Sequence, residues 1–115
     1  MNAIQLKQIR TLLFLSCADA AELIGNCEVR TWQRWEKGDR QIPLDVATTV
    51  SMLSLSLYER ITQGVDENSA ESRYFDSYHE YKVAGGTGTH IMWHLAQATS
   101  AQLELRRAAL SWADQ

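Results

Sequence analysis

The sequence predicts a mainly α-helical protein, with four to five helices in residues 1–63 and a small C-terminal extension of α(+β) structure in residues 73–115. Three observations carry this prediction. Apolar residues recur every three or four positions along most of the chain, which is the period of an amphipathic helix. Residues that start or end helices stand at the boundaries of these segments. The stretch 64–72 is polar, acidic and small, which is typical of a linker.

The composition is that of a globular protein. Of the 115 residues, 45 % are hydrophobic, and no apolar run is long enough to span a bilayer. The N-terminus lacks the charged and then apolar pattern of a secretion signal. Cys17 and Cys27 fit a reducing compartment better than a disulfide framework, and we interpret them as small buried hydrophobic residues. We therefore expect a cytoplasmic protein with no membrane contact, associated with the nucleoid when it is bound to DNA.

The net charge of −3 is unevenly distributed along the chain. Residues 1–63 hold seven basic and seven acidic side chains, whereas residues 64–115 hold four basic and seven acidic ones. Because a local patch binds phosphate, an acidic chain can still contain a nucleic-acid-binding surface. The balance argues against a protein that coats DNA without regard to sequence.

Residues 3–14 form the first predicted helix, with Ile4, Ile9, Leu12 and Leu13 near helical spacing. Ser16 is a good N-cap for a second helix through "CADAAELI", and Asp19 stands at the capping-box distance. Gly25 is the residue expected just past the end of that helix. The next residues, "NCE", turn the chain.

Residues 28–37 form the third predicted helix, which Gly38 ends. After the link "DRQI", Pro43 suits the first turn of a fourth helix of about twenty residues, roughly 30 Å long. The apolar positions of this helix are Ile42, Val46, Val50, Leu53, Leu57 and Ile61.

The C-terminal extension is less sharply defined. Residues 73–75, "RYF", suit a short strand, and residues 76–84, "DSYHEYKVA", suit a short helix or a continuation of that strand. Residues 85–88, "GGTG", form a turn. Residues 89–112 form a final helix with Thr89 as its cap.

The third predicted helix has two chemically different faces. At about 100° per residue, one face carries aromatic and acidic side chains, and the other carries long hydrogen-bond donors and an amide. The first set is Glu28, Trp32, Trp35 and Glu36; the second is Arg30, Gln33, Arg34 and Lys37.

The second face suits the major groove of DNA, because arginine can donate two hydrogen bonds to guanine and glutamine can pair with adenine. We expect Arg30, Gln33 and Arg34 to read bases, and Lys37 and Arg40 to hold phosphates on either side. The alternative is an ordinary amphipathic helix with a solvated polar face. A helix, a glycine, a tight turn and a second helix together favour the helix-turn-helix interpretation.

Residues 16–43, "SCADAAELIGNCEVRTWQRWEKGDRQIP", resemble the Cro/phage-repressor-like (XRE-type) helix-turn-helix family over about residues 4–57. The resemblance implies that the third predicted helix enters the groove. It also implies a structural ion pair between Arg10 and Glu36. Family members often have glutamine after the capping serine, where it contacts a phosphate. This chain has Cys17 there, so the contact is absent or is made by Ser16 or by backbone N–H groups.

The whole chain resembles a narrower group, the anti-CRISPR-associated regulators and related small bacterial proteins of the same layout. The matching segments are "TWQRWEKG" and the tail "YFDSYHEYKVAGGTGTHIMWHLAQATSAQLEL". This resemblance implies a homodimeric autorepressor that binds an inverted repeat in its own promoter. It implies dimerisation through the C-terminal region, and RNA binding in some members.

Other chemistry has weaker support in the sequence. His90 and His94 lie four residues apart, but a zinc site needs a third ligand, for which His79 is the nearest residue, so we expect no metal and no cofactor. The glycine-rich stretch 85–90 lacks the lysine of a phosphate-binding loop. The tyrosine-rich segment 74–81 suits a small core or dimer contact better than a base-stacking surface.

Three classes of function follow. The leading one is a sequence-specific, homodimeric transcriptional repressor that binds double-stranded DNA. The second is an antitoxin or adaptor whose tail binds a protein partner, with DNA or RNA binding secondary. The third is an enzyme, which we do not expect because no set of nucleophile, base and acid stands in a recognisable catalytic context.

Overall fold

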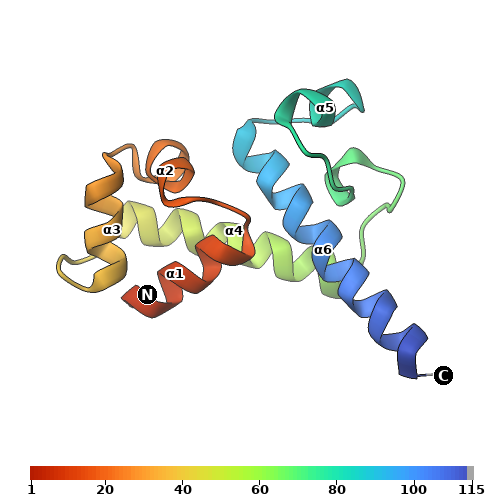
Figure 1. Ribbon diagram of the computed structural model, residues 1–115, viewed down its shortest axis with the longest axis horizontal. Coiled ribbons are helices and arrows are strands. Elements are labelled where there is room, and N and C mark those ends of the chain that lie inside the picture. Colours follow the sequence, from red (N-terminus) through yellow and green to blue (C-terminus); the bar gives the residue numbers. More distant parts are fainter. Residues whose placement is uncertain (114–115) are drawn as a thin grey trace. The chain divides into compact units, whose positions relative to one another are not determined.

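The computed structural model describes residues 1–113 and is built from helices and connecting loops, with no strand among those residues (Figure 1). Residues 114 and 115, the end of the predicted C-terminal region, lie outside the described residues. The mainly α-helical fold class is confirmed. The elements are α1 (Ala3–Leu12), α2 (Cys17–Ala20), the π-helical turn η1 (Ala21–Gly25), α3 (Val29–Lys37), α4 (Leu44–Gln63), the 3₁₀ turn η2 (Ala70–Ser72), α5 (Tyr78–Val83) and α6 (His90–Ala113).

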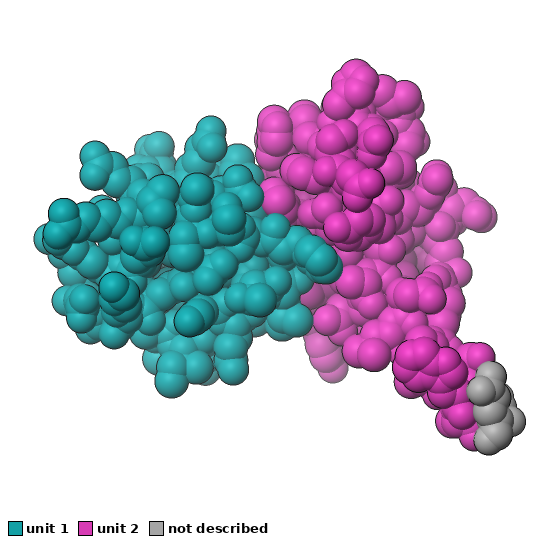
Figure 2. All heavy atoms as spheres, viewed as in Figure 1, with its two compact units in different colours: residues 1–56 teal, residues 57–115 magenta. Residues whose placement is uncertain are grey.

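Two compact units divide the chain, unit 1 at residues 1–56 and unit 2 at residues 57–115 (Figure 2). Their boundary lies inside α4, which contributes residues to both units. The proposed division into residues 1–63, 64–72 and 73–115 stays a prediction. Within the described residues, no helix is both long enough and apolar enough to cross a bilayer.

The buried face of α1 differs from the prediction. Leu6 and Leu13 are buried, whereas Ile4 and Leu12 are exposed. Leu6 and Leu13 lie seven residues apart, two turns of helix, so they share one stripe that packs in unit 1. The sequence offers more apolar residues than one face requires, and spacing alone did not decide which of them face inward.

The link from α1 to α2 contains a helix ending that the sequence did not signal. Phe14 has a left-handed φ of 59°, and the Leu15 N–H donates to the Arg10 carbonyl oxygen at 3.2 Å. Glycine usually occupies this position, so a phenylalanine gave no indication of it. Ser16 caps α2 as predicted, because its Oγ accepts a hydrogen bond from the Asp19 N–H at 3.0 Å.

The turn between η1 and α3 uses two residues for two different reasons. The left-handed residue is Asn26, with a φ of 47°, and not Gly25 as the sequence suggested. Gly25 is needed for space. A Cβ atom there would lie 2.8 Å from the Cys27 sulfur and 3.1 and 3.2 Å from the rings of Trp32 and Trp35.

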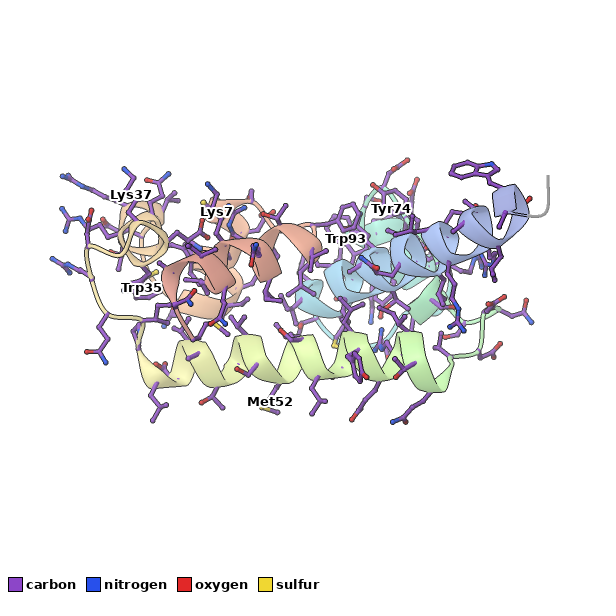
Figure 3. All side chains as sticks on the ribbon, turned by 90° about the horizontal axis from the view of Figure 1, so that it is seen from below. Lys7, Trp35, Lys37, Met52, Tyr74 and Trp93 are labelled. Carbon is purple, nitrogen blue, oxygen red and sulfur yellow. The ribbon has the colours of Figure 1, made fainter. Side chains whose placement is uncertain are left out.

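The tryptophans of α3 face inward, as the helical spacing predicted. Trp32 is fully buried, Trp35 nearly so, and their rings meet edge to face at a centroid distance of 5.6 Å. Trp35 lies on the side of α3 that faces α4 (Figure 3). Gly38 ends α3 with a left-handed φ of 82°, and its N–H donates to the Trp35 carbonyl oxygen.

An ion pair joins α1, the link after it, and α3. Arg10 Nε donates to Glu36 Oε2 at 2.6 Å, and Nη2 donates to Glu36 Oε1 at 3.1 Å. The third contact is from Arg10 Nη1 to the Leu15 carbonyl oxygen at 2.8 Å. Trp32 Nε1 also donates to Glu36 Oε2, at 2.5 Å. The two side chains are only 14 % and 7 % exposed, and hydrogen bonding to Glu36 raises the pKa of the Arg10 guanidinium above its ordinary value.

Unit 2 is organised around a small aromatic core. Tyr81 is fully buried and its hydroxyl donates to the Thr87 carbonyl oxygen at 2.6 Å. A side chain at Gly86 would collide with the Tyr81 ring at 2.5 Å. The residues of this cluster are Ala70, Phe75, Tyr78, Tyr81, Met92, Trp93 and Ala96. The tyrosine-rich segment therefore contributes to a core, as favoured from the sequence.

The short strand considered at residues 73–75 does not form. The Phe75 carbonyl oxygen accepts hydrogen bonds from Trp93 Nε1 at 2.8 Å and from Gln97 Nε2 at 3.0 Å. Side chains of α6 thus satisfy a backbone group that would otherwise need a partner strand. For residues 76–84 the sequence left a short helix or a continued strand open, and the helix forms, as α5 at Tyr78–Val83.

Replacing Glu36 with alanine should lower the free energy of unfolding by about 3–5 kcal/mol, because Arg10 would keep a mostly buried and unpaired charge. Thermal or urea unfolding of the Glu36→Ala protein measures this loss. Glu59→Ala is the matched control, since it removes an exposed glutamate from helix α4. Its effect should stay within about 0.5 kcal/mol. Equal melting temperatures for Glu36→Ala and wild type would exclude the structural role of the pair.

Gly25→Ala should destabilise the protein by about 1–3 kcal/mol, the usual cost of overpacking. Alanine also has a helix propensity that is higher by about 1 kcal/mol, which offsets only part of this cost. The double variant Gly25→Ala/Cys27→Ala removes the nearest colliding atom, so it should recover part of the loss relative to Cys27→Ala alone. Urea denaturation of the variants tests this. A Gly25→Ala protein as stable as wild type would contradict the close-packing explanation.

Candidate nucleic-acid interface

The outward face of α3 gathers four of the residues predicted to contact DNA. Arg30, Gln33 and Lys37 are exposed and Arg34 is half-buried. Together with Asp39, they line one open hollow of about 520 Å³. Three cationic side chains and one amide therefore surround a surface that a base edge can approach, and only one carboxylate opposes them. This is the arrangement expected of a surface that reads hydrogen-bond acceptors.

The remaining two residues predicted to contact phosphate lie on other elements. Arg40 is exposed in the link between α3 and α4, two residues beyond Gly38. Ser16 is exposed at the start of α2, where its hydroxyl oxygen already accepts the Asp19 N–H. The Ser16 hydroxyl proton is still available to donate to an anion.

A second hollow, of about 270 Å³, lies where α1 meets α3. Its lining residues are Lys7, Arg10, Cys17, Gln33, Glu36 and Lys37. Gln33 and Lys37 line both hollows, so the two share an edge on α3. Figure 3 shows the side chains of Lys7 and Lys37 projecting on the same side of unit 1.

Sequence reasoning missed Lys7 and Asp39 as members of these surfaces. Lys7 stands three residues before Arg10 and therefore on the same face of α1. Arg10 was expected to pair with Glu36 of α3. Since Lys7 shares a helix face with Arg10, the sequence could have indicated that Lys7 also lies beside α3. Asp39 had no comparable signal, because it follows the end of α3 and its direction depends on the turn at Gly38.

The histidines considered as metal ligands have other surroundings. His90 stacks on the Tyr78 ring at a centroid distance of 3.7 Å, whereas His94 is buried and tilted against the Trp93 ring. Across residues 1–113, no three histidine, cysteine, aspartate or glutamate side chains are grouped so that they could hold a metal ion.

The two cysteines are free thiols and half-buried, rather than fully buried as interpreted from the sequence. Burial raises the pKa of the Cys27 thiol, which disfavours its reactive thiolate form. The Cys17 sulfur lies 4.0 Å from Glu36 Oε1 and lines the second hollow. Cys17 thus belongs to the surroundings of the ion pair.

The chain is similar to known proteins over nearly its whole length. The family described as Aca2/YdiL-like matches residues 1–108. A relative from Pectobacterium phage ZF40, named Aca2 repressor, is 31 % identical over 102 residues, which cover 84 % of this chain and 87 % of the relative. The family match includes α1 to α5 and most of α6. The chain therefore belongs to the Aca2/YdiL-like family.

Proposed function

We propose that this protein is a sequence-specific DNA-binding transcriptional repressor that acts as a homodimer on an inverted repeat. In this proposal α2, η1 and α3 form a helix-turn-helix of the Cro/phage-repressor type, and α3 enters the major groove. The observation that carries it is the two-sided character of α3. Its tryptophans and Glu36 are held inside unit 1, while Arg30, Gln33, Arg34 and Lys37 line one outward hollow.

The fixed orientation of α3 supports base reading. Trp32 and Trp35 anchor the helix in the core, and the bidentate pair of Arg10 with Glu36 prevents rotation about its axis. A reading helix that is held in one orientation loses less conformational entropy when it binds DNA. In our proposal the side chains that read bases are Arg30, Gln33 and Arg34.

We propose phosphate contacts from three residues in and near the outward hollow of α3. Lys37 lies at the end of α3, Arg40 lies in the link that follows, and Ser16 lies at the start of α2. Contacts of this kind set the position of the protein on the duplex without reading sequence. The carboxylate of Asp39 at the rim can accept a hydrogen bond from the amino group of cytosine.

The relative named Aca2 repressor supports repression as the outcome of DNA binding. Occupation of a promoter by such a protein excludes polymerase. We propose further that the promoter is the protein's own.

Dimerisation is proposed through the C-terminal half of α6. Leu105 and Trp112 lie seven residues apart on one face and are 62 % and 68 % exposed. Ala108 and Ala109 stand between them, so the stripe has the spacing of a helix-pairing seam. Within unit 2, the last turns of α6 extend past α5 and η2 (Figure 1). A helix-turn-helix protein needs two copies to read two half-sites, which makes a second copy of α6 the expected partner of this stripe.

Selection of bound duplexes from a random DNA pool tests the proposed function. Enrichment of an inverted repeat with half-sites about one helical turn apart is the expected result. Parallel selection from an RNA pool is the control. Enrichment of RNA alone, or of no nucleic acid, would contradict the proposal and favour the protein-interaction alternative.

Arg30→Ala should weaken binding to the selected duplex by about 1–3 kcal/mol and relax the preference at one base position of each half-site. Fluorescence anisotropy against single-base variants of the duplex measures both effects. Arg73→Ala, which removes an exposed arginine of unit 2, should leave the base preferences unchanged. If Arg30→Ala weakened binding to every duplex equally, Arg30 would be a phosphate contact.

Leu105→Asp/Trp112→Asp should convert the dimer to a monomer, because each aspartate would bring an unpaired charge into an apolar seam. Light scattering coupled to size-exclusion chromatography gives the mass directly. Leu110→Asp is the matched control, since Leu110 is 64 % exposed on the same helix but lies on a different face. A dimer that persists in the double variant, or is lost equally in Leu110→Asp, would place the interface elsewhere.

A further inference from the structure

The hollow between α1 and α3 has a polar lining, as does the outward hollow of α3 beside it. All six lining side chains are polar or carry sulfur, and they come from α1, α2 and α3. Three of them are cationic and one is anionic. Apolar side chains, which dominate the walls of pockets for small organic molecules, are absent from this lining.

The charges of the lining are not equally available to a ligand. Arg10 and Glu36 neutralise each other in a bidentate pair, and Arg10 also donates to the Leu15 carbonyl oxygen. Lys7 and Lys37 are both exposed, and they project on the same side of unit 1 (Figure 3). The ammonium groups of Lys7 and Lys37 are therefore available to bind an anion, next to the neutral ion pair of Arg10 with Glu36.

The position of this hollow indicates which anion it would hold. Gln33 and Lys37 line this hollow, and they also line the outward hollow of α3 that Arg30 and Arg34 line. A group bound between Lys7 and Lys37 would thus stand beside the bases that Gln33 contacts. In a duplex the group next to the edge of the major groove is a backbone phosphodiester.

We propose that Lys7 and Lys37 together bind one phosphodiester of the DNA strand that borders the groove, at a site built by α1 and α3. This proposal rests on the proposed function and adds a phosphate contact from α1 to it. Lysine suits the role, because its ammonium group has three donors on a flexible stem and needs no fixed bidentate geometry.

Cys17 is the lining residue least suited to an anion. Its thiol lies near Glu36 and is a weak donor, so it makes a poor phosphate ligand. Lys7, in the same lining, is the cationic side chain that α1 leaves free to bind one. The ion pair of Arg10 with Glu36 has a second role here, since it sets the distance between the helices that carry the two lysines.

The first test is the salt dependence of binding by wild type and Lys7→Gln to the duplex selected from the random pool. Lys7→Gln should bind more weakly on specific and random DNA alike, with base preferences unchanged. The slope of log affinity against log salt concentration should become shallower, by no more than about 0.9 for each bound protomer, because Lys37 still contacts the shared phosphate. Lys82→Gln is the matched control, because it removes an exposed lysine on α5 and should keep the wild-type slope.

The second test removes the charge of single phosphates. Methylphosphonate is placed at one backbone position at a time along the half-site. One position should weaken wild-type binding, and the same position should weaken Lys7→Gln and Lys37→Gln by less, because each single variant keeps one lysine on the shared phosphate. Only the double variant Lys7→Gln/Lys37→Gln should be insensitive at that position. Both side chains are exposed, so the lysine variants should have the melting temperature of wild type. This measurement checks that the fold is retained.

The outcomes separate this proposal from the proposed function. A wild-type protein that binds no duplex in preference to random DNA would contradict both. Tight specific binding with an unchanged salt slope in Lys7→Gln would overturn the phosphate site alone. A loss confined to one base pair would make Lys7 a reading residue and would also overturn it. Different insensitive phosphates for the two lysines would show two separate contacts and no shared site.

Discussion

The arrangement of the helices in unit 1 depends on the carboxylate of Glu36. It accepts hydrogen bonds from two nitrogens of Arg10 and from the indole of Trp32, so a charge that is almost fully buried has every oxygen satisfied. Removing such a pair from water is expensive, and its attraction compensates only when the geometry is this complete. Because Arg10 also binds the Leu15 carbonyl oxygen, one network fixes α1, the link to α2, and α3. This network determines how the three segments are arranged more than it adds to the net free energy of unfolding.

That arrangement determines the two outer surfaces. With Trp32, Trp35 and Glu36 turned inward, the helical period leaves Arg30, Gln33, Arg34 and Lys37 on the outside as one set. The same network places α1 next to α3, which brings Lys7 to the hollow that Lys37 also lines. A single buried contact thus orients a surface suited to bases and a neighbouring surface suited to phosphate. The acidic net charge of the chain does not oppose this, because the charges are arranged locally.

Unit 2 is stabilised in a different way. Side chains of α5 and α6 donate hydrogen bonds to backbone carbonyl oxygens in its irregular segments. Trp93 and Gln97 both donate to the Phe75 carbonyl oxygen, and Tyr81 donates to that of Thr87. These bonds fix the segment before α5 and the turn after it against α6. The apolar stripe at the end of α6 has no part in that core, which leaves it available for contact with a second copy.

The helices of unit 1, the cap at Ser16 and the two faces of α3 could all be predicted from the sequence, because local spacing and capping chemistry control these features. The sequence could not choose which residues of α1 turn inward, since Ile4 and Leu6 both suit a helical face and only packing against neighbouring helices excludes one. Nor could it show that Phe14 would adopt a left-handed conformation. Those features depend on contacts between residues far apart in the chain, and no local pattern records such contacts.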